Sequence, residues 1–262
     1  GDPVAAPVQI HGSCDPRFHR VRDAFARSFA EHGEVGAACC VYLGGEPVVD
    51  LWAGVADAST GAPWQEDTLA MVFSSTKGVT AACLNLLIER GRIDPDAPVS
   101  RDWPEFGAAG KERIPVRWAL SHRAGVPAID AALTLEECLA WDPVVAAVAA
   151  QRPEWEPGTR HGYHARSYGW IAGELVRRVS GRSLGRFFRE EIAEPLGLDF
   201  WIGLPPEQEP RVARLIPPVP PEDPGMRALF ERFMGPDTPL GRVMTGPSNL
   251  FHYDEMWNTR PL

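Results

Sequence analysis

The stretch from Ala70 to Gly91 constrains the fold most, because a largely apolar helix of this length has to be buried. A short apolar run ends at Ser74, and the apolar helical pattern then continues to a glycine at Gly91. Ser74 and Lys77 stand three residues apart at the start of this predicted helix, so their side chains share one face. The spacing places a hydroxyl beside an amine, and a neutral amine can activate a hydroxyl as a nucleophile.

The scarcity of lysine strengthens this interpretation. The chain contains 24 arginines but only two lysines, Lys77 and Lys111. A lysine can lose its proton inside a protein, whereas an arginine cannot. A chance Ser-x-x-Lys is the alternative, but the pattern is also a named catalytic motif in which the serine is the nucleophile. We therefore interpret Ser74 as a nucleophile and Lys77 as the residue that activates it.

Composition excludes several classes of function. The chain has 262 residues, 44% of them hydrophobic, which suffices for one large domain or two coupled ones. A net charge of −9 without a basic stripe argues against a nucleic-acid partner. No apolar run reaches the roughly 18 to 20 residues of a membrane span, and nothing indicates a membrane partner or a cofactor.

The five cysteines are odd in number and lack the spacing of metal ligands, so no metal site is expected. Ordinary core thiols fit a reduced compartment, and the expected location is cytoplasmic. No signal peptide is visible at the N-terminus. If one has been removed, the protein is secreted or periplasmic.

The order of the predicted elements indicates an α/β opening followed by helices. An amphipathic helix is predicted from Asp15 to Gly33, and strand-like runs at 35–43 and 47–52 are joined by Gly44-Gly45, a hairpin signal. Later helices are expected over 131–150, from Trp170 to Gly181, from Ser183 onward, and over 226–234. Residues 204–224 contain eight prolines, which exclude regular helix or sheet.

Two further segments offer competing catalytic residues. Residues 181–185 satisfy Gly-x-Ser-x-Gly, the nucleophile elbow of α/β-hydrolases, with Asp237 and His252 as triad partners. That motif needs a strand before its serine, whereas the preceding segment here has a helical period, so Ser183 is expected to be an N-cap. His122, in the polar loop 121–126, is an alternative base, although such a residue more often holds a loop by hydrogen bonds.

The ordered motifs resemble the serine β-lactamase-like family of class C β-lactamases, D-alanyl-D-alanine peptidases and family VIII carboxylesterases. They cover about residues 15–200 and lie at 73–77, 120–126, 157–163, 179–184 and 194–198. The resemblance implies an α/β fold in which an antiparallel sheet is flanked by helices and a helical domain is inserted. Residues 1–110 would form the N-terminal part of the α/β domain with the nucleophile helix. Residues 111–262 would form the mainly helical domain and an irregular, proline-rich region.

The resemblance also implies a third catalytic group. The tyrosine of the family's Tyr-x-Asn motif matches Tyr163, whereas Tyr168 lies inside the following predicted helix and is expected to be structural. The implied catalytic residues are therefore Ser74, Lys77 and Tyr163. Ala165 stands where the lactamases carry asparagine, whose side chain holds the antibiotic's amide, and this departure favours ester substrates.

The family's last motif, Lys-Thr-Gly or a variant on a sheet strand, has no counterpart in this sequence, because Met244-Thr245-Gly246 precedes a proline in irregular sequence. We expect the chain to represent about the first two thirds of the fold, without its C-terminal strands. A second polypeptide would then complete the fold, or the sequence is a truncated or cleaved product.

The expected function is that of a serine hydrolase that cleaves short-chain carboxylic esters, its small-molecule substrates, through an acyl-enzyme on Ser74. The alternatives within the family are a β-lactamase and a D-amino-acid peptidase or amidase. From another class, the alternative is a non-catalytic binding relative or an inactive fragment.

Overall fold

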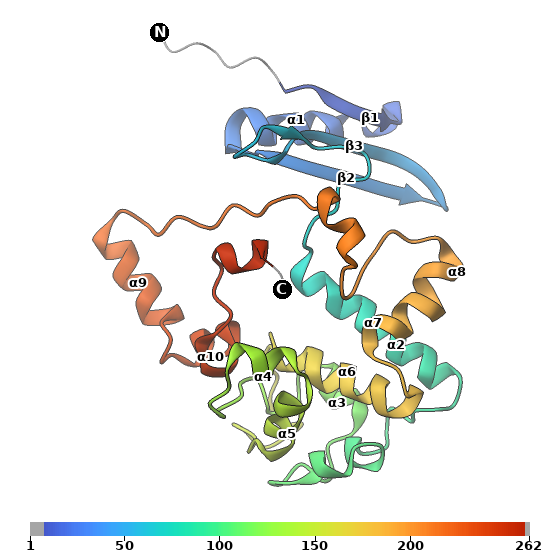
Figure 1. The fold of residues 1–262 in the computed structure, drawn as a ribbon, viewed down its shortest axis with the longest axis vertical. Helices are drawn as coiled ribbons and strands as arrows, with labels where there is room; N and C mark the ends of the chain where they lie inside the picture. The colour runs from blue at the N-terminus through green and yellow to red at the C-terminus, as the bar shows by residue number, and fades with distance from the viewer. Residues whose placement is uncertain (1–7, 260–262) are drawn as a thin grey trace. The chain divides into compact units, whose positions relative to one another are not determined.

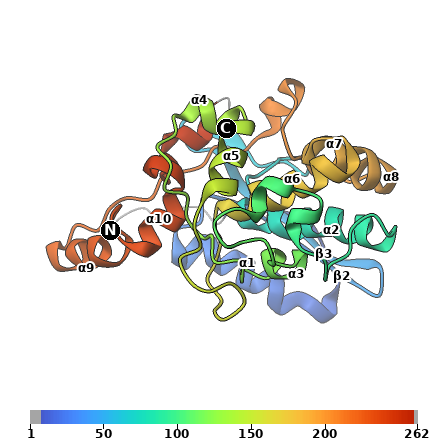
Figure 2. The same cartoon turned by 90° about the horizontal axis from the view of Figure 1, so that it is seen from below.

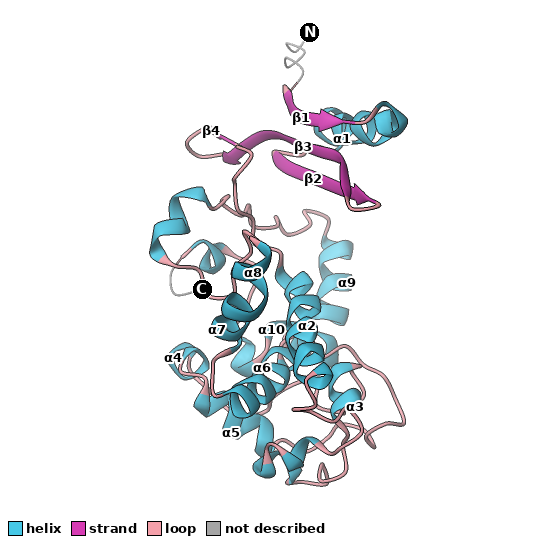
Figure 3. Cartoon of the chain, turned by 90° about the vertical axis from the view of Figure 1, so that its right-hand side faces the viewer, coloured by secondary structure: helices cyan, strands magenta, loops and turns pink. Residues whose placement is uncertain are grey.

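The computed structural model of the chain describes residues 8–259. It combines helices with a small antiparallel sheet, and the strands all lie in the N-terminal part of the described chain (Figure 3). The chain divides into two compact units. The first contains the residues up to Met71 together with Pro205–Ile216, and the second contains Val72–Leu204 and the residues from Pro217 onward. The predicted division into 1–110 and 111–262 concerns the family's domains and stays a prediction.

The first unit is a sheet covered on one face by a helix (Figure 1). Its elements are β1 (Ile10–Cys14), α1 (His19–His32), β2 (Gly36–Leu43), β3 (Glu46–Asp57) and β4 (Ala62–Pro63). The strand order is β1-β3-β2, with β4 paired to one end of β3, and all pairs are antiparallel. Phe18, Val21 and Phe25 pack on Val49 and Leu51 of β3, as their helical spacing predicts.

The predicted hairpin between β2 and β3 is confirmed. Gly44 and Gly45 have φ values of 61° and 87°, and a two-residue turn with both φ values positive matches the twist of the flanking strands. Strand β3 runs five residues beyond the predicted end at Trp52. Strand β1 was not predicted, because it exists only through its pairing with β3, in which Ile10 lies opposite Ala53.

The second unit is built from helices around one apolar core. Its α-helices are α2 (Thr76–Glu89), α3 (Val116–Leu120), α4 (Leu135–Leu139), α5 (Asp142–Ala150), α6 (Ser167–Ser180), α7 (Leu184–Phe188), α8 (Glu194–Leu196), α9 (Pro224–Met234) and α10 (Pro239–Thr245). Helices α2 and α6 lie side by side (Figures 1 and 2). Cys83, Leu84 and Leu87 of α2 belong to the same buried cluster as Leu175 and Val176 of α6. None of the described helices combines the length and apolarity needed to cross a bilayer.

Two sequence predictions need correction, the first in this unit and the second in the segment 205–216 of the first unit. The single helix expected over 131–150 is two helices, because Trp141 has a φ of 67° and Pro143, which lacks an N–H, begins a new helix at α5. Residues 204–224 are not wholly irregular, since Pro206–Arg211 forms a 3₁₀ turn. Met244 and Thr245 end helix α10, so the Met-Thr-Gly sequence lies on no strand.

Candidate active site

Ser74 lies in a 3₁₀ turn, Phe73–Ser75, that leads directly into α2. Phe73 has a φ of 42°, a left-handed conformation that a bulky residue adopts only when its surroundings hold it there. Its ring packs edge-on against Trp257 at 5.4 Å and lies 5.8 Å from the ring of Tyr253. The C-terminal segment thus contacts the turn that presents the exposed Ser74 side chain.

The structure brings the three residues proposed from the sequence into contact, and all three belong to the second unit. The hydroxyl of Tyr163 donates a hydrogen bond to Ser74 Oγ at 2.6 Å, and Lys77 Nζ donates to the same oxygen at 3.1 Å. Lys77 Nζ also donates to the backbone oxygen of Ala165 at 2.7 Å and lies 5.0 Å from the centre of the Tyr163 ring. One hydroxyl therefore faces an amine and a phenol.

Tyr163 is held in place by hydrogen bonds between its own loop and the loop 121–126. The N–H of His164 donates to His122 Nδ1 at 3.0 Å, and the N–H of Gly162 donates to the His122 carbonyl oxygen at 3.1 Å. In return, the N–H of Val126 donates to His164 Nε2 at 3.0 Å, and His164 Nδ1 contacts the Gly162 oxygen at 2.6 Å. His122 and His164 are thus cross-links between two loops.

The surroundings of Tyr163, His164 and His122 shift the pKa values of these side chains. Burial acts to raise the pKa of Tyr163, but its hydrogen bonds to Ser74 and Lys77 and the charges of Lys77 and Arg166 outweigh burial, so the pKa lies below the ordinary value. Burial lowers the pKa of His164 to about 4. Burial, together with the charges of His161 and Lys77, also lowers the pKa of His122. Both histidines are therefore neutral imidazoles at pH 7, which suits their role as hydrogen-bond acceptors.

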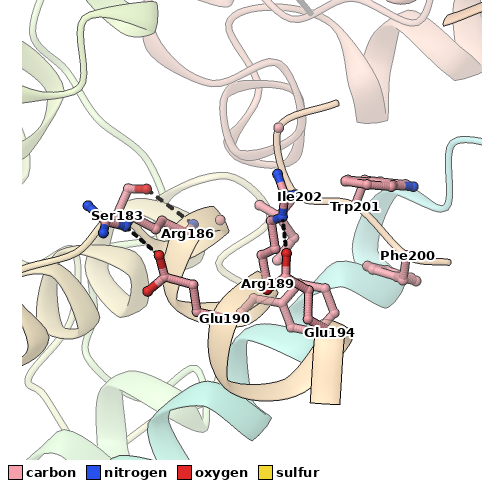
Figure 4. A pocket seen from close by; sticks show the side chains of 11 residues that line it. Ser183, Arg186, Arg189, Glu190, Glu194, Phe200, Trp201 and Ile202 are labelled. Atoms are coloured by element: carbon pink, nitrogen blue, oxygen red, sulfur yellow. Dashed lines mark hydrogen bonds and ion pairs between the residues drawn. The ribbon is translucent and has the colours of Figure 1, made fainter. Parts of the chain in front are cut away.

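The competing residues occupy other environments. Tyr168 is 4% exposed inside α6 and belongs to the core, as expected. Ser183 is the N-cap of α7, where its Oγ accepts from the N–H of Arg186 at 3.3 Å, so the N-cap prediction is confirmed. It borders a hollow of about 620 Å³ in which Arg186 pairs with Glu190 and Arg189 with Glu194 (Figure 4). No histidine lines this hollow, and its two glutamates are each paired with an arginine, so no free base is offered to Ser183 by the lining residues.

Two features of the site were missed by the sequence reasoning. Arg166 lies among the rings of Phe251, Tyr253 and Trp257, and its Nε donates to the Met244 oxygen. The tail had no periodicity to interpret, and its three aromatic residues within seven positions were the only available signal.

Among residues 8–259, no group of three His, Cys, Asp or Glu side chains is arranged to hold a metal ion.

Comparison with curated proteins identifies several relatives. The chain is 42% identical over 212 residues to the esterase/beta-lactamase LipL of Mycobacterium tuberculosis, an alignment that covers 80% of this chain and 49% of the relative. It is 28% identical over 179 residues to a beta-lactamase of Escherichia coli, covering 68% of this chain and 46% of that protein. The chain thus spans about half the length of the curated relatives it matches.

Solved structures show the same similarity. A family VIII carboxylesterase superposes with a TM-score of 0.76 at 46% identity, over 80% of this chain and 58% of that one. A penicillin-binding protein homologue from Caulobacter crescentus superposes with a TM-score of 0.79 at 40% identity, over 92% and 63% of the two chains. The family model described as Beta-lactamase matches residues 21–254, which is most of the chain. The chain belongs to the β-lactamase family.

Proposed function

We propose that the chain carries the nucleophile and the base of a serine hydrolase that cleaves short-chain carboxylic esters. The observation that supports this most directly is the position of Ser74 Oγ, 2.6 Å from the Tyr163 hydroxyl and 3.1 Å from Lys77 Nζ. A serine hydroxyl is a weak nucleophile until a neighbouring group accepts its proton. Here the amine of Lys77 and the phenol of Tyr163 both lie within proton-transfer distance of that hydroxyl.

The proposed reaction begins when Ser74 Oγ bonds to the ester carbonyl carbon and its proton passes to Tyr163, assisted by Lys77. The negative charge moves to the carbonyl oxygen, where the backbone N–H of Ser74, at the start of the helical segment, is a suitable donor. The carbonyl reforms as the bond to the alcohol oxygen breaks, and Tyr163 returns the proton to that oxygen. Water then attacks the acyl-enzyme by the same path and releases Ser74.

Two observations favour esters over β-lactams. Ala165 offers a methyl group where the family resemblance expects an amide side chain, and its backbone oxygen is already bonded to Lys77. A solved structure that is 46% identical to this chain is described as a family VIII carboxylesterase. A β-lactamase or D-amino-acid peptidase activity is the alternative, and comparing nitrocefin turnover with p-nitrophenyl butyrate turnover distinguishes the two.

The decisive experiment compares two serines. Ser74→Ala should abolish both p-nitrophenyl butyrate hydrolysis and the intact-mass adduct formed with a fluorophosphonate probe. Ser183→Ala should keep most of both activities, because it removes only a helix cap, at a stability cost of about 1 kcal/mol. The adduct requires only the nucleophile and its base, so it reports on them even where turnover is slow. If the adduct survives Ser74→Ala and is lost in Ser183→Ala, the proposal is wrong.

A further inference from the structure

The backbone of Phe73 is strained at the point where the chain presents Ser74. The N–H of Ser75 donates to the Val72 oxygen at 3.1 Å, so residues 72–75 form a tight turn, in which Phe73 is the second residue and has a φ of 42°. Glycine, asparagine and aspartate are the usual residues at this place when φ is positive, whereas a bulky side chain adopts such a φ at a cost in free energy. The surroundings of Phe73 must therefore hold this conformation.

The ring of Trp257 is well placed to hold it. The ring centres of Phe73 and Trp257 are 5.4 Å apart at an interplanar angle of 74°, the edge-to-face geometry that aromatic pairs favour. Tyr253 adds a second ring at 5.8 Å. Trp257 is itself fixed, because its Nε1 donates to the His252 oxygen at 2.6 Å and the Arg166 guanidinium lies 5.0 Å from its ring centre. A ring fixed in this way resists a rotation of Phe73.

The conformation of Phe73 determines where the Ser74 hydroxyl lies, because the two residues share a peptide bond. A return of Phe73 to a negative φ would rotate that peptide bond. Ser74 Oγ would then leave its place 2.6 Å from the Tyr163 hydroxyl and 3.1 Å from Lys77 Nζ. Proton transfer depends on such distances, and a displacement of about 1 Å can slow a reaction about 100-fold.

Ordinary core packing explains only part of the contact between the two rings. Trp257 packs on the apolar core of the second unit and lies 6.1 Å from the Phe251 ring. Packing alone does not require a left-handed backbone at Phe73, since an aromatic side chain reaches a core from an ordinary conformation as well. Glycine would adopt the positive φ without strain, but it would also leave negative values open. A phenylalanine held by a second ring has one conformation.

We propose that Trp257 is a positioning residue for the ester cleavage described above: its ring holds Phe73 in the left-handed conformation and so directs Ser74 Oγ toward Tyr163 and Lys77. The inference rests on the proposed function. The effect of Trp257 passes through the backbone of Phe73 and not through a contact with the reacting atoms.

The test measures fluorophosphonate adduct formation on Ser74, by intact mass of the full chain, at increasing probe concentrations. In that reaction the Oγ–P bond forms, fluoride leaves, and the Ser74 proton passes to the base. Trp257→Ala should slow the rate at saturating probe roughly 10- to 100-fold, while the probe concentration that gives half of this rate changes little. Trp257→Phe, which keeps a ring against Phe73, should restore most of the rate.

Two substitutions at position 73 test the route of the effect. Phe73→Gly and Phe73→Ala both remove the ring, but only glycine adopts a positive φ without strain, so the glycine variant should form the adduct faster. In the glycine variant, Trp257→Ala should have no further effect, because the ring that Trp257 holds is gone. The inference is overturned if alanine at position 73 reacts as fast as glycine, or if Trp257→Ala slows both backgrounds equally.

Trp141→Ala is the matched control for lost stability. Trp141 is also partly buried in the second unit, and its Nε1 donates a hydrogen bond to Glu174 at 2.8 Å. Its removal should lower the urea concentration at the midpoint of unfolding but leave the rate at saturating probe unchanged. If that rate falls as far as in Trp257→Ala, lost stability explains both results and the inference is wrong.

The remaining outcomes separate this inference from the proposed function. If Trp257→Ala does not fold, the glycine and alanine variants at position 73 still decide. If the wild-type chain forms no adduct on Ser74, the proposed function itself fails. An adduct that forms equally fast in the wild type and in Trp257→Ala leaves the function standing and refutes only the role of Trp257.

Discussion

The two lysines of the chain have opposite surroundings. Lys111 is fully buried, and its ammonium donates to the carbonyl oxygens of Ala108 at 2.8 Å, Ala149 at 2.9 Å and Gln151 at 2.6 Å. Three donors thus meet three acceptors at the end of α5. Lys77 is half-buried and faces Ser74. Lysine therefore stabilises the fold at position 111 and contacts the candidate nucleophile at position 77.

Exchanging each lysine for methionine should separate these roles. Lys111→Met leaves the buried carbonyl oxygens of Ala149 and Gln151 without this donor and should lower the free energy of unfolding by about 2 kcal/mol or more. Lys77→Met loses one backbone hydrogen bond and should cost less than about 1 kcal/mol, while adduct formation on Ser74 is lost. Urea unfolding and intact-mass labelling of both variants measure the two quantities. Equal stability losses would contradict the assignment.

At the scale of elements, the pairing of the loops 121–126 and 158–164 depends on a neutral histidine. His164 Nε2 accepts the N–H of Val126, which a protonated ring cannot do. Burial lowers the pKa of His164 from its ordinary value of 6.5 to about 4. Between these pH values the unfolded chain binds a proton that the folded chain does not. Stability is therefore fully present above pH 6.5 and declines as the pH falls toward 4.

His164→Gln should remove this pH dependence, because glutamine offers a neutral acceptor and a neutral donor in place of the ring. The wild type is expected to lose about 3 kcal/mol of unfolding free energy between pH 6.5 and 4 through this histidine, and the variant should lose correspondingly less. Urea unfolding at a series of pH values gives the comparison. The exposed His19, replaced by glutamine, is the control. A variant curve parallel to that of the wild type would refute the prediction.

Elements with local causes could be predicted from the sequence. The Ser74–Lys77 spacing, the Gly44-Gly45 hairpin and the N-cap at Ser183 each depend on residues a few positions apart, and the structure shows all three features. Strand β1 and the packing of Trp257 on Phe73 depend on partners about 40 and about 180 positions away, respectively. The periodicity of a sequence carries no information on such long-range pairings, so they became visible only in the structure. Arg166 was missed for the same reason.

At the scale of the whole molecule, each unit has its own apolar core. Leu51, with no exposed surface, lies in the core of the first unit, near the thiols of Cys14 and Cys39. Leu175, equally buried, lies in the core of the second unit, which also contains Cys83 and Cys138. All five cysteines are free thiols, so labelling the thiols of each core can measure the unfolding of that core.

Truncating a buried side chain in one core should lower the urea concentration at which the thiols of that core become reactive, more than for the thiols of the other core. Leu51→Ala and Leu175→Ala each remove a buried side chain, at an expected cost of about 2–5 kcal/mol. Thiol labelling in increasing urea, read out by peptide mass, should show Cys39 reacting at lower urea in the first variant and Cys83 at lower urea in the second. If both cysteines shift equally in both variants, the two cores unfold as one cooperative body.

The preference for arginine over lysine has a practical consequence for any search for binding partners. Amine-directed cross-linkers need accessible primary amines, and of the two lysine side chains one is wholly enclosed while the other points at a candidate catalytic serine. Most of the surface is therefore invisible to such reagents, and the lysine they do reach is one whose modification would inactivate the proposed enzyme. The 35 acidic side chains make carboxylate-directed coupling the appropriate chemistry for mapping contacts.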